Sequence, residues 1–219
     1  LISFVPFVAA VDMDILAAAA TNGTNVIRLM SEGYKTVEIS LELLLPVEEE
    51  INTSAALIRG VAAKICEMGY EVKGFDAYMI SDVLKGSGLS SSAAFEVILG
   101  TIMNKLFCKG QIDAVKIAKI GQYAENIFFG KPSGLMDQMA SSVGGIVAID
   151  FRNIDHPVVK KLDFDFSKTG YSLCIIDSGA DHADLTAEYA AIPREMGIVA
   201  DAVGKKVLTD TTMDEVLDN

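Results

Sequence analysis

The sequence predicts an α+β fold in which helices cover one side of an antiparallel sheet. Three observations predict this class. Short apolar stretches with turn residues between them fill the first forty residues, longer segments with apolar residues every three or four positions follow, and the two kinds of segment do not alternate as strand–helix–strand units. The chain has 219 residues, of which 51% are hydrophobic, so it can bury one good core.

The N-terminal part of the chain is expected to form strands. Residues 1–11 are apolar enough to suggest a secretory signal, but no basic residue precedes them, and Asp12 and Asp14 follow at once. We therefore interpret them as a core strand. Turn residues at 21–24 and 32–33 separate the next apolar stretches, and this pattern predicts an antiparallel meander over the first forty residues.

The rest of the chain contains four segments with the apolar spacing of helices. Gly69 stands where the C-cap of the first is expected, and Pro193 is expected to kink the last. Three of the helices are predicted at 54–68, 113–129 and 183–206. The other follows the glycine-rich turn after the strand at 75–83 and contains Phe95 and Leu106. Further strands are predicted at 75–83, 145–151 and 171–176, and a domain boundary near 168–171.

The net charge, the length of the apolar runs and the cysteines indicate which partners and which compartment to expect. The formal net charge is −12, whereas a nucleic-acid surface needs clustered Lys and Arg, so no nucleic-acid partner is expected. Apolar runs such as 16–20 are far shorter than the roughly 20 residues that span a bilayer, so no membrane partner is expected either. Cys66, Cys108 and Cys174 lie in apolar stretches without a metal-site spacing, which predicts reduced core residues and a cytoplasmic protein.

The segment from Lys85 to Ala94 is the most informative, because it places two glycines and three serines before a long amphipathic helix. Glycines let a backbone approach an anion, and the free amides and dipole of a helix start favour negative charge. The segment has neither the Walker nor the Rossmann pattern. Ser is also a good N-cap and Gly a good turn former, so composition alone leaves phosphate binding and an ordinary turn both open.

The order Gly88-Leu89-Ser90-Ser91-Ser92-Ala93-Ala94 resembles the second motif of the GHMP kinases, a family that includes galactokinase, homoserine kinase, mevalonate kinase and phosphomevalonate kinase. Lys85 departs from the family, which has proline near this place, and the exchange should alter loop stiffness more than chemistry. The family's motif wraps nucleotide phosphates, so the resemblance implies ATP. The residues implied in phosphate binding are Gly86, Ser87, Gly88, Leu89, Ser90, Ser91, Ser92 and Ala93.

A second segment narrows the resemblance to the galactokinase branch of the family. It comprises Gln122-Tyr123-Ala124-Glu125, a spacer, and Pro132-Ser133-Gly134-Leu135-Met136-Asp137-Gln138. The resemblance implies that Ser92 and Glu125 hold Mg²⁺ and that Gly134 and Asp137 contact the sugar, with Asp137 facing the anomeric hydroxyl. Whether Asp137 is a general base or a positioning group stays open. Taken alone, Glu125 would be an ordinary solvated side chain and Asp137 a turn or cap residue.

A third segment, residues 177–186, is rich in Asp and includes His182, which suggests a metal site. No second histidine lies near His182, and Asp181 and Asp184 suit the first turn of a helix. The segment also resembles the passage into the second half of galactokinases. We therefore expect structural support here and not a metal site.

The resemblance implies the GHMP kinase fold, with a ribosomal protein S5 domain 2-like, ATP-binding domain at 1–170 and the start of a ferredoxin-like domain at 171–219. It also implies phosphorylation of galactose by ATP in galactose catabolism. The family's N-terminal sugar signature and its third glycine-rich motif have no counterpart in the sequence. Two alternatives therefore stay open: an inactive relative that binds sugar or ATP, and a kinase for N-acetylgalactosamine or arabinose. Exposed apolar helix faces after Tyr171 lead us to expect a homodimer, misfolding or a missing partner segment.

Overall fold

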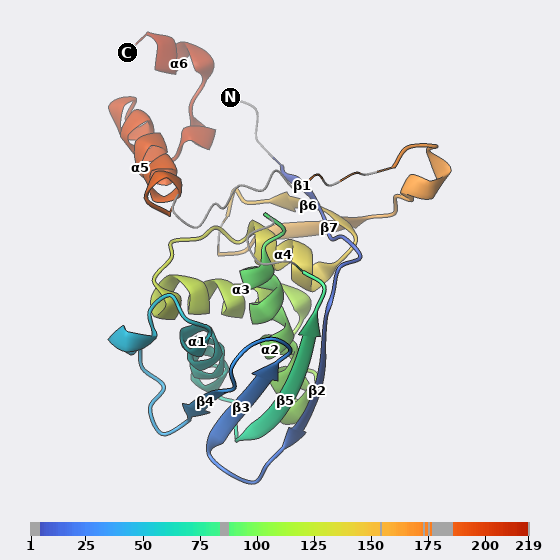
Figure 1. The fold of residues 1–219 in the computed structure, drawn as a ribbon. Helices are drawn as coiled ribbons and strands as arrows, with labels where there is room; N and C mark the ends of the chain where they lie inside the picture. Colours follow the sequence, from blue (N-terminus) through green and yellow to red (C-terminus); the bar gives the residue numbers. More distant parts are fainter. Residues whose placement is uncertain are drawn as a thin grey trace. The chain divides into compact units, whose positions relative to one another are not determined.

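The computed structural model describes residues 5–83, 88–153, 155–172, 174, 176 and 186–218 (Figure 1). The chain divides into two compact units. The larger unit is Ala10–Gly144, and the smaller one comprises Leu1–Ala9 and Gly145–Asn219. The predicted boundary between the family's two domains, near residues 168–171, stays a prediction.

A four-stranded sheet forms one layer of the larger unit. Its strands are β2 (Ile15–Thr21), β3 (Val26–Ser31), β4 (Val37–Ser40) and β5 (Phe75–Ser81), in the order β2-β5-β3-β4. Strand β5 is antiparallel to β2 and parallel to β3, whereas β3 and β4 form an antiparallel pair. The predicted meander is therefore wrong at its first connection, because β5 lies between β2 and β3.

Strand β5 lies between β2 and β3 for two reasons: its inward side chains are buried in the core, and the turn before β3 binds its first residues. Its inward side chains are at most 1% exposed, namely Phe75, Ala77 and Met79. The turn between β2 and β3 binds the start of β5, since Asn22 Nδ2 donates to Asp76 Oδ1 at 2.7 Å. The backbone N–H of Gly74 donates to the carbonyl of Thr24 at 2.8 Å. These contacts join residues about fifty positions apart, which a local pattern does not reveal.

Helices cover one face of this sheet, as the sequence predicts (Figure 1). The helix predicted at 54–68 is α1, and Gly69 follows it with a φ of 92°, the left-handed conformation of a C-cap. The helix predicted at 113–129 is α3 followed by a π-helical turn, and α4 was not predicted. The bounds are α1 (Ser54–Glu67), α2 (Ser91–Phe107), α3 (Ala114–Tyr123), the π-helical turn (Ala124–Phe129) and α4 (Met136–Val143).

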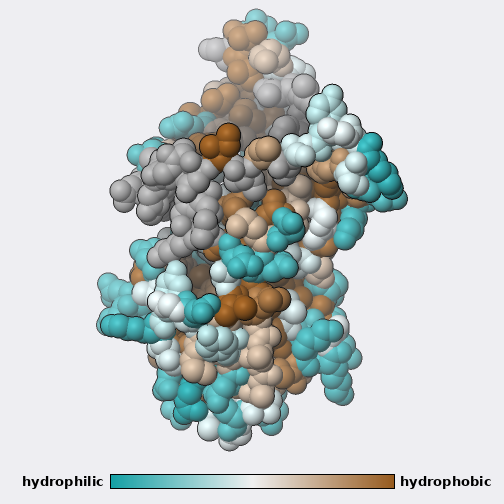
Figure 2. Space-filling view, turned by 45° about the vertical axis from the view of Figure 1, so that its right-hand side comes forward, coloured by the Kyte–Doolittle hydropathy of each residue, from teal (hydrophilic) through white to brown (hydrophobic). Residues whose placement is uncertain are grey.

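The core of the larger unit lies between the helices and the inward face of the sheet. One buried cluster joins strand residues such as Ile27 and Phe75 to helix residues such as Ile58 and Leu99. Apolar side chains also reach the surface among hydrophilic ones (Figure 2). On the outward face of the sheet, four of them are 40% exposed or more, namely Leu16, Met30, Tyr78 and Ile80. Within the described residues of the larger unit, helices therefore cover only the inward face of this sheet.

The smaller unit contains an antiparallel sheet in the order β1-β6-β7, with β1 (Phe7–Ala9), β6 (Ile146–Asp150) and β7 (Val158–Leu162). The strand predicted at 1–11 is thus short, and it is wrong as a core strand because Phe7 is 70% exposed. Strand β7 was not predicted. Of the strand predicted at 171–176, Leu173 and Ile175 lie outside the described residues, and the described neighbours are not in a strand.

Two helices follow in the smaller unit, α5 (Thr186–Ala202) and α6 (Met213–Leu217). Helix α5 corresponds to the helix predicted at 183–206 and contains Pro193, while residues 183–185 lie outside the described part. Cys174 is exposed, so the prediction of a core residue is wrong there, whereas Cys108 is buried as predicted. Within the described residues, no helix has the length and apolar character that a membrane span requires.

Substitution of Gly60 by Ala is expected to destabilise the larger unit, because α1 contacts the π-helical turn at this glycine. A Cβ there would lie 2.7 Å from Ala124 Cβ and 2.8 Å from Ala124 Cα. Relief of this overlap requires a backbone shift, so we expect Gly60→Ala to lower the free energy of unfolding by about 1–3 kcal/mol in urea denaturation.

The matched control is Gly197→Ala in α5, where the added methyl group meets nothing within 4 Å. Alanine favours a helix interior over glycine by about 1 kcal/mol, so this variant should be as stable as the wild type or more so. A Gly60→Ala protein as stable as Gly197→Ala would contradict the close packing of α1 against the turn.

Candidate active site

The N-terminus of α2 is the centre of the candidate site. Gly88, Leu89 and Ser90 lead into the helix, and Ser91, Ser92 and Ala93 form its first turn. Gly86 and Ser87 lie outside the described residues. The free backbone N–H groups of such a helix start and its dipole favour an anion. The structure thus places six of the eight residues predicted to bind phosphate at one helix end.

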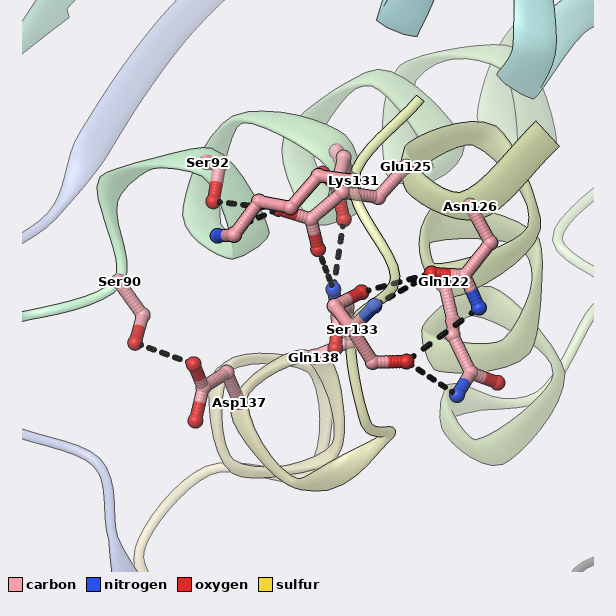
Figure 3. A network of polar contacts seen from close by, with 10 residues as sticks. Ser90, Ser92, Gln122, Glu125, Asn126, Lys131, Ser133, Asp137 and Gln138 are labelled. Atoms are coloured by element: carbon pink, nitrogen blue, oxygen red, sulfur yellow. Dashed lines mark hydrogen bonds and ion pairs between the residues drawn. The ribbon is translucent and has the colours of Figure 1, made fainter. Parts of the chain in front are cut away.

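Ser90 has an unusual backbone conformation for a non-glycine residue, with φ 57° and ψ 50°. This left-handed geometry costs of the order of 1 kcal/mol and tends to occur at functional sites. The Ser90 side chain does not cap α2. Instead, Ser90 Oγ donates a hydrogen bond to Asp137 Oδ2 at 2.7 Å (Figure 3). The strained turn therefore connects the predicted phosphate-binding segment to the predicted catalytic carboxylate.

Asp137 lies in the first turn of α4, where the helix dipole favours a negative charge. Its side chain is exposed, so a substrate can reach it. The loop before α4 is tied back to the end of α3, since Ser133 N–H donates to Asn126 Oδ1 at 2.7 Å and Gln122 Nε2 donates to the Ser133 carbonyl at 3.2 Å. These bonds fix the chain just ahead of Gly134 and thereby set the position of α4.

Glu125 lies on the other side of the α2 N-terminus and is 2% exposed. Its Oε1 accepts from Ser92 Oγ at 3.2 Å and from Lys131 Nζ at 3.1 Å (Figure 3). The π-helical turn places Glu125 near its start and ends at Gly130, after which the backbone N–H of Lys131 donates to the Glu125 carbonyl at 3.1 Å. Such π-helical turns are frequent at functional sites.

Gln138 joins Glu125 to a second buried acid. Its Nε2 donates to Glu125 Oε2 at 2.8 Å and to Glu96 Oε2 at 3.0 Å. Gln138 is 1% exposed and Glu96 is fully buried at 0%. Ser92, Glu125, Gln138 and Glu96 therefore form one continuous polar network that runs from the helix start into the core.

Burial raises the pKa of Glu96 from its ordinary value of 4.5 to about 9, and the nearby carboxylates of Glu125 and Asp137 add to the increase. The hydrogen bond from Gln138 and the charge of Lys131 oppose it. Between pH 4.5 and about 9, the folded protein holds a proton on Glu96 that the unfolded chain releases. The stability contribution of this proton is complete below pH 4.5 and is lost as the pH rises toward 9.

The stability of Glu96→Gln relative to the wild type should therefore rise with pH. We expect the difference in unfolding free energy to widen by about 1 kcal/mol for each pH unit between pH 5 and pH 8. Parallel urea titrations of the two proteins at several pH values measure it, and titrating groups that do not interact with Glu96 cancel in the difference. A difference that does not change with pH would show that Glu96 is already ionised in the folded protein.

The network also offers a place for a divalent cation. Among the described residues, no group of three or more His, Cys, Asp or Glu side chains is placed to share a metal ion. Mg²⁺ at nucleotide sites needs only one or two protein oxygens, because phosphates and water supply the others. Ser92 Oγ and Glu125 Oε1, 3.2 Å apart, fit this requirement. The ammonium group of Lys131 against the same Glu125 oxygen shows that this position already attracts positive charge.

Structural support, and not a metal site, is predicted at 177–186; residues 177–185 lie outside the described part of the chain, so this stays a prediction. Sequence reasoning missed three members of the network, namely Lys131, Gln138 and Glu96. Lys131 and Gln138 stand inside the motif that carries Glu125 and Asp137, so their position was a usable signal. Glu96 lies one helical turn after Ser92, which places it on the same side of α2.

Comparisons with known proteins show which family the sequence resembles. Residues 56–145 match the model of the GHMP kinases N terminal domain. The galactokinase of Streptomyces coelicolor is 33% identical over 179 residues, which are 80% of this chain and 45% of that protein. The galactokinase of Actinobacillus pleuropneumoniae is 36% identical over 184 residues, 81% of this chain and 45% of that protein. The chain spans about half the length of the curated relatives it matches.

Solved structures show the same fold. The crystal structure of Lactococcus lactis galactokinase complexed with galactose superimposes with a TM-score of 0.67 at 18% identity, over 96% of this chain and 58% of that one. The Methanococcus jannaschii mevalonate kinase gives a TM-score of 0.56 at 18% identity, over 95% of this chain and 64% of that one. The chain therefore has the GHMP kinase fold, and its residues 56–145 match the N-terminal domain of that family. The two relatives described above, with which it shares 33% and 36% of its residues over the matched parts, are galactokinases.

Proposed function

We propose that this chain belongs to a galactokinase, which transfers the γ-phosphoryl group of ATP to the anomeric hydroxyl of galactose. The observation that carries the proposal is the placement of two carboxylates beside one helix start. Ser90 binds Asp137 at 2.7 Å and Ser92 binds Glu125 at 3.2 Å, so the first residues of α2 hold an exposed acid and a buried acid. The sequence similarity to galactokinases supports galactose as the acceptor.

In this proposal each carboxylate has its own task. The N–H groups at the start of α2 bind the nucleotide phosphates, and Glu125 with Ser92 holds Mg²⁺. A bound Mg²⁺ offsets the charge that develops on the transferring phosphoryl group. Asp137 binds the attacking hydroxyl, and Gly134 lies in the adjoining loop. Because Ser90 occupies Oδ2 of Asp137, we assign Oδ1 to the sugar hydroxyl.

Two further assignments belong to the proposal. A cytoplasmic location is supported by three unpaired cysteines, Cys66, Cys108 and Cys174, because disulfides persist in oxidising compartments. A homodimer stays a prediction, which the exposed apolar side chains of α5, such as Ile192 and Ile198, support. Sedimentation of the purified chain measures the oligomeric state.

Sugar-dependent release of ADP tests the function. The full chain is incubated with Mg²⁺ and ATP, and galactose, N-acetylgalactosamine and arabinose are compared at equal concentration. The proposal expects the largest kcat/KM with galactose. A preference for another sugar would indicate a different GHMP sugar kinase, and binding of ATP without sugar-dependent turnover would indicate an inactive binding protein.

A further inference from the structure

Glu96 is the most deeply buried acid of the described residues near the site. It is neither of the two residues predicted to hold Mg²⁺, which are Ser92 and Glu125. It lies on α2, one turn after Ser92, and is 0% exposed. Its Oε2 accepts from Gln138 Nε2 at 3.0 Å, and the same nitrogen donates to Glu125 Oε2 at 2.8 Å. One amide group thus uses its two N–H bonds to connect Glu96 with Glu125.

Two buried atoms of this network have no hydrogen-bond partner in the structure, namely Glu96 Oε1 and Gln138 Oε1. If Glu96 is ionised, both atoms are acceptors and neither can satisfy the other. A proton on Glu96 Oε1 makes that atom a donor and leaves Gln138 Oε1 as an acceptor in the same side-chain pair. A neutral Glu96 thus supplies a donor beside an unpartnered acceptor, whereas an ionised Glu96 leaves two buried acceptors, which is unfavourable.

The space around the pair is filled, which limits other arrangements. Gly121 of α3 packs directly against it, because a Cβ at Gly121 would lie 3.0 Å from both Cβ and Oε2 of Glu96 and 3.3 Å from Gln138 Cγ. Three helices therefore enclose the pair, with Glu96 on α2, Gly121 on α3 and Gln138 on α4. A change in either side chain must be transmitted to its partner.

We propose that Glu96 is a positioning residue of the magnesium–nucleotide site, which holds Gln138 and through it fixes the carboxylate of Glu125 against Ser92. This inference rests on the proposed function, since it assigns the metal to Glu125 and Ser92. Glu96 acts as a neutral acid, and burial, which raises its pKa to about 9, favours that form at neutral pH. Gln138 then keeps Glu125 Oε2 occupied and directs Oε1 toward Ser92 and the cation.

The test compares three variants of the full chain by titration of a fluorescent ADP analogue, with Mg²⁺ and with EDTA. Glu96→Gln keeps a neutral donor and acceptor, and Glu96→Met removes both at similar size. Asn104→Met is the matched control, because Asn104 is also a buried polar residue of α2 but lies outside the network. Its Nδ2 donates to the Ile112 carbonyl at 2.9 Å, and its Oδ1 accepts from the Ile112 N–H at 3.1 Å.

We expect Glu96→Met to weaken the Mg²⁺-dependent part of nucleotide binding by about 10- to 100-fold, the usual effect of losing a partner that orients a metal ligand. Binding in EDTA should stay within about threefold of the wild type, and Glu96→Gln should stay within about threefold in both conditions. Asn104→Met should lower stability and leave the Mg²⁺ dependence unchanged. If Glu96→Met does not fold, Gln138→Met breaks the same connection and should give the same loss.

Three results would overturn the inference. If nucleotide binding by Glu96→Met depends on Mg²⁺ as strongly as in the wild type, Glu96 does not act on the metal site. The same conclusion holds for Gln138→Met if Glu96→Met does not fold. A loss in Glu96→Gln as large as in Glu96→Met would show that the site needs a charged Glu96. If the wild type itself binds nucleotide without any Mg²⁺ dependence, the proposed metal site fails, and the inference fails with it.

Discussion

Asp137→Asn is expected to lower kcat for galactose phosphorylation by about 10²- to 10⁴-fold, the usual range for a group that takes or directs a proton. Asparagine has the shape of aspartate, and its amide oxygen can still accept the hydrogen bond from Ser90. It carries no negative charge and cannot take a proton from the sugar. The loss should therefore appear in kcat, while the affinity for Mg²⁺-ATP, measured by calorimetry, stays close to that of the wild type.

Asp113→Asn is the matched control for this exchange. Asp113 caps α3 by accepting from the backbone N–H of Lys116 at 2.9 Å, and asparagine is an equally good N-cap. The control should keep both stability and kcat. Turnover by Asp137→Asn within about tenfold of the wild type would remove Asp137 from the chemistry, since a proton-transferring group contributes more than that.

Glu125→Gln is expected to raise the Mg²⁺ concentration needed for half-maximal turnover by roughly a hundredfold. A metal–carboxylate contact contributes several kcal/mol, and about 1.4 kcal/mol corresponds to a factor of ten. Glutamine keeps the size of the side chain, but its neutral oxygen holds a cation weakly and leaves Lys131 without its ion-pair partner. Titration of Mg²⁺ at fixed ATP and galactose measures this shift.

Glu67→Gln serves as the control for the loss of an ion pair alone. Glu67 pairs with Lys64 at 2.9 Å on the surface of α1, with its side chain 59% exposed. An exposed pair of this kind contributes about 0–1 kcal/mol, so neither stability nor the Mg²⁺ requirement should change noticeably. An unchanged Mg²⁺ requirement in Glu125→Gln would assign the metal to other residues.

The fold was predictable from the sequence wherever the pattern is local. The helix at 54–68 has regular apolar spacing and a glycine at its end, and the structure ends α1 at Glu67 with Gly69 left-handed. The order of the sheet was not predictable in this way. Strand β5 enters between β2 and β3 through contacts of Asn22 and Gly74 with distant residues, and a strand sequence does not record its neighbours.

Part of the candidate site was likewise predictable from the sequence, and part was not. The motifs identified Ser92, Glu125 and Asp137, and the structure brings Ser90 to Asp137 across 47 positions and Ser92 to Glu125 across 33. The spacing of Glu96 from Ser92 places it on the same side of α2 but does not predict its burial, because a glutamate on an amphipathic helix usually faces solvent. Its burial depends on Gly121 and Gln138, which come from two other helices.

The most direct test of the account is ³¹P NMR of the product formed from galactose and Mg²⁺-ATP by the full chain. We predict one new phosphate monoester signal, coupled to the anomeric proton of galactose, whose rate of appearance falls by about 10²- to 10⁴-fold in Asp137→Asn. Absence of this signal under conditions where ATP is bound, or its equal appearance with Asp137→Asn, would contradict the proposal that these residues form a galactokinase active site.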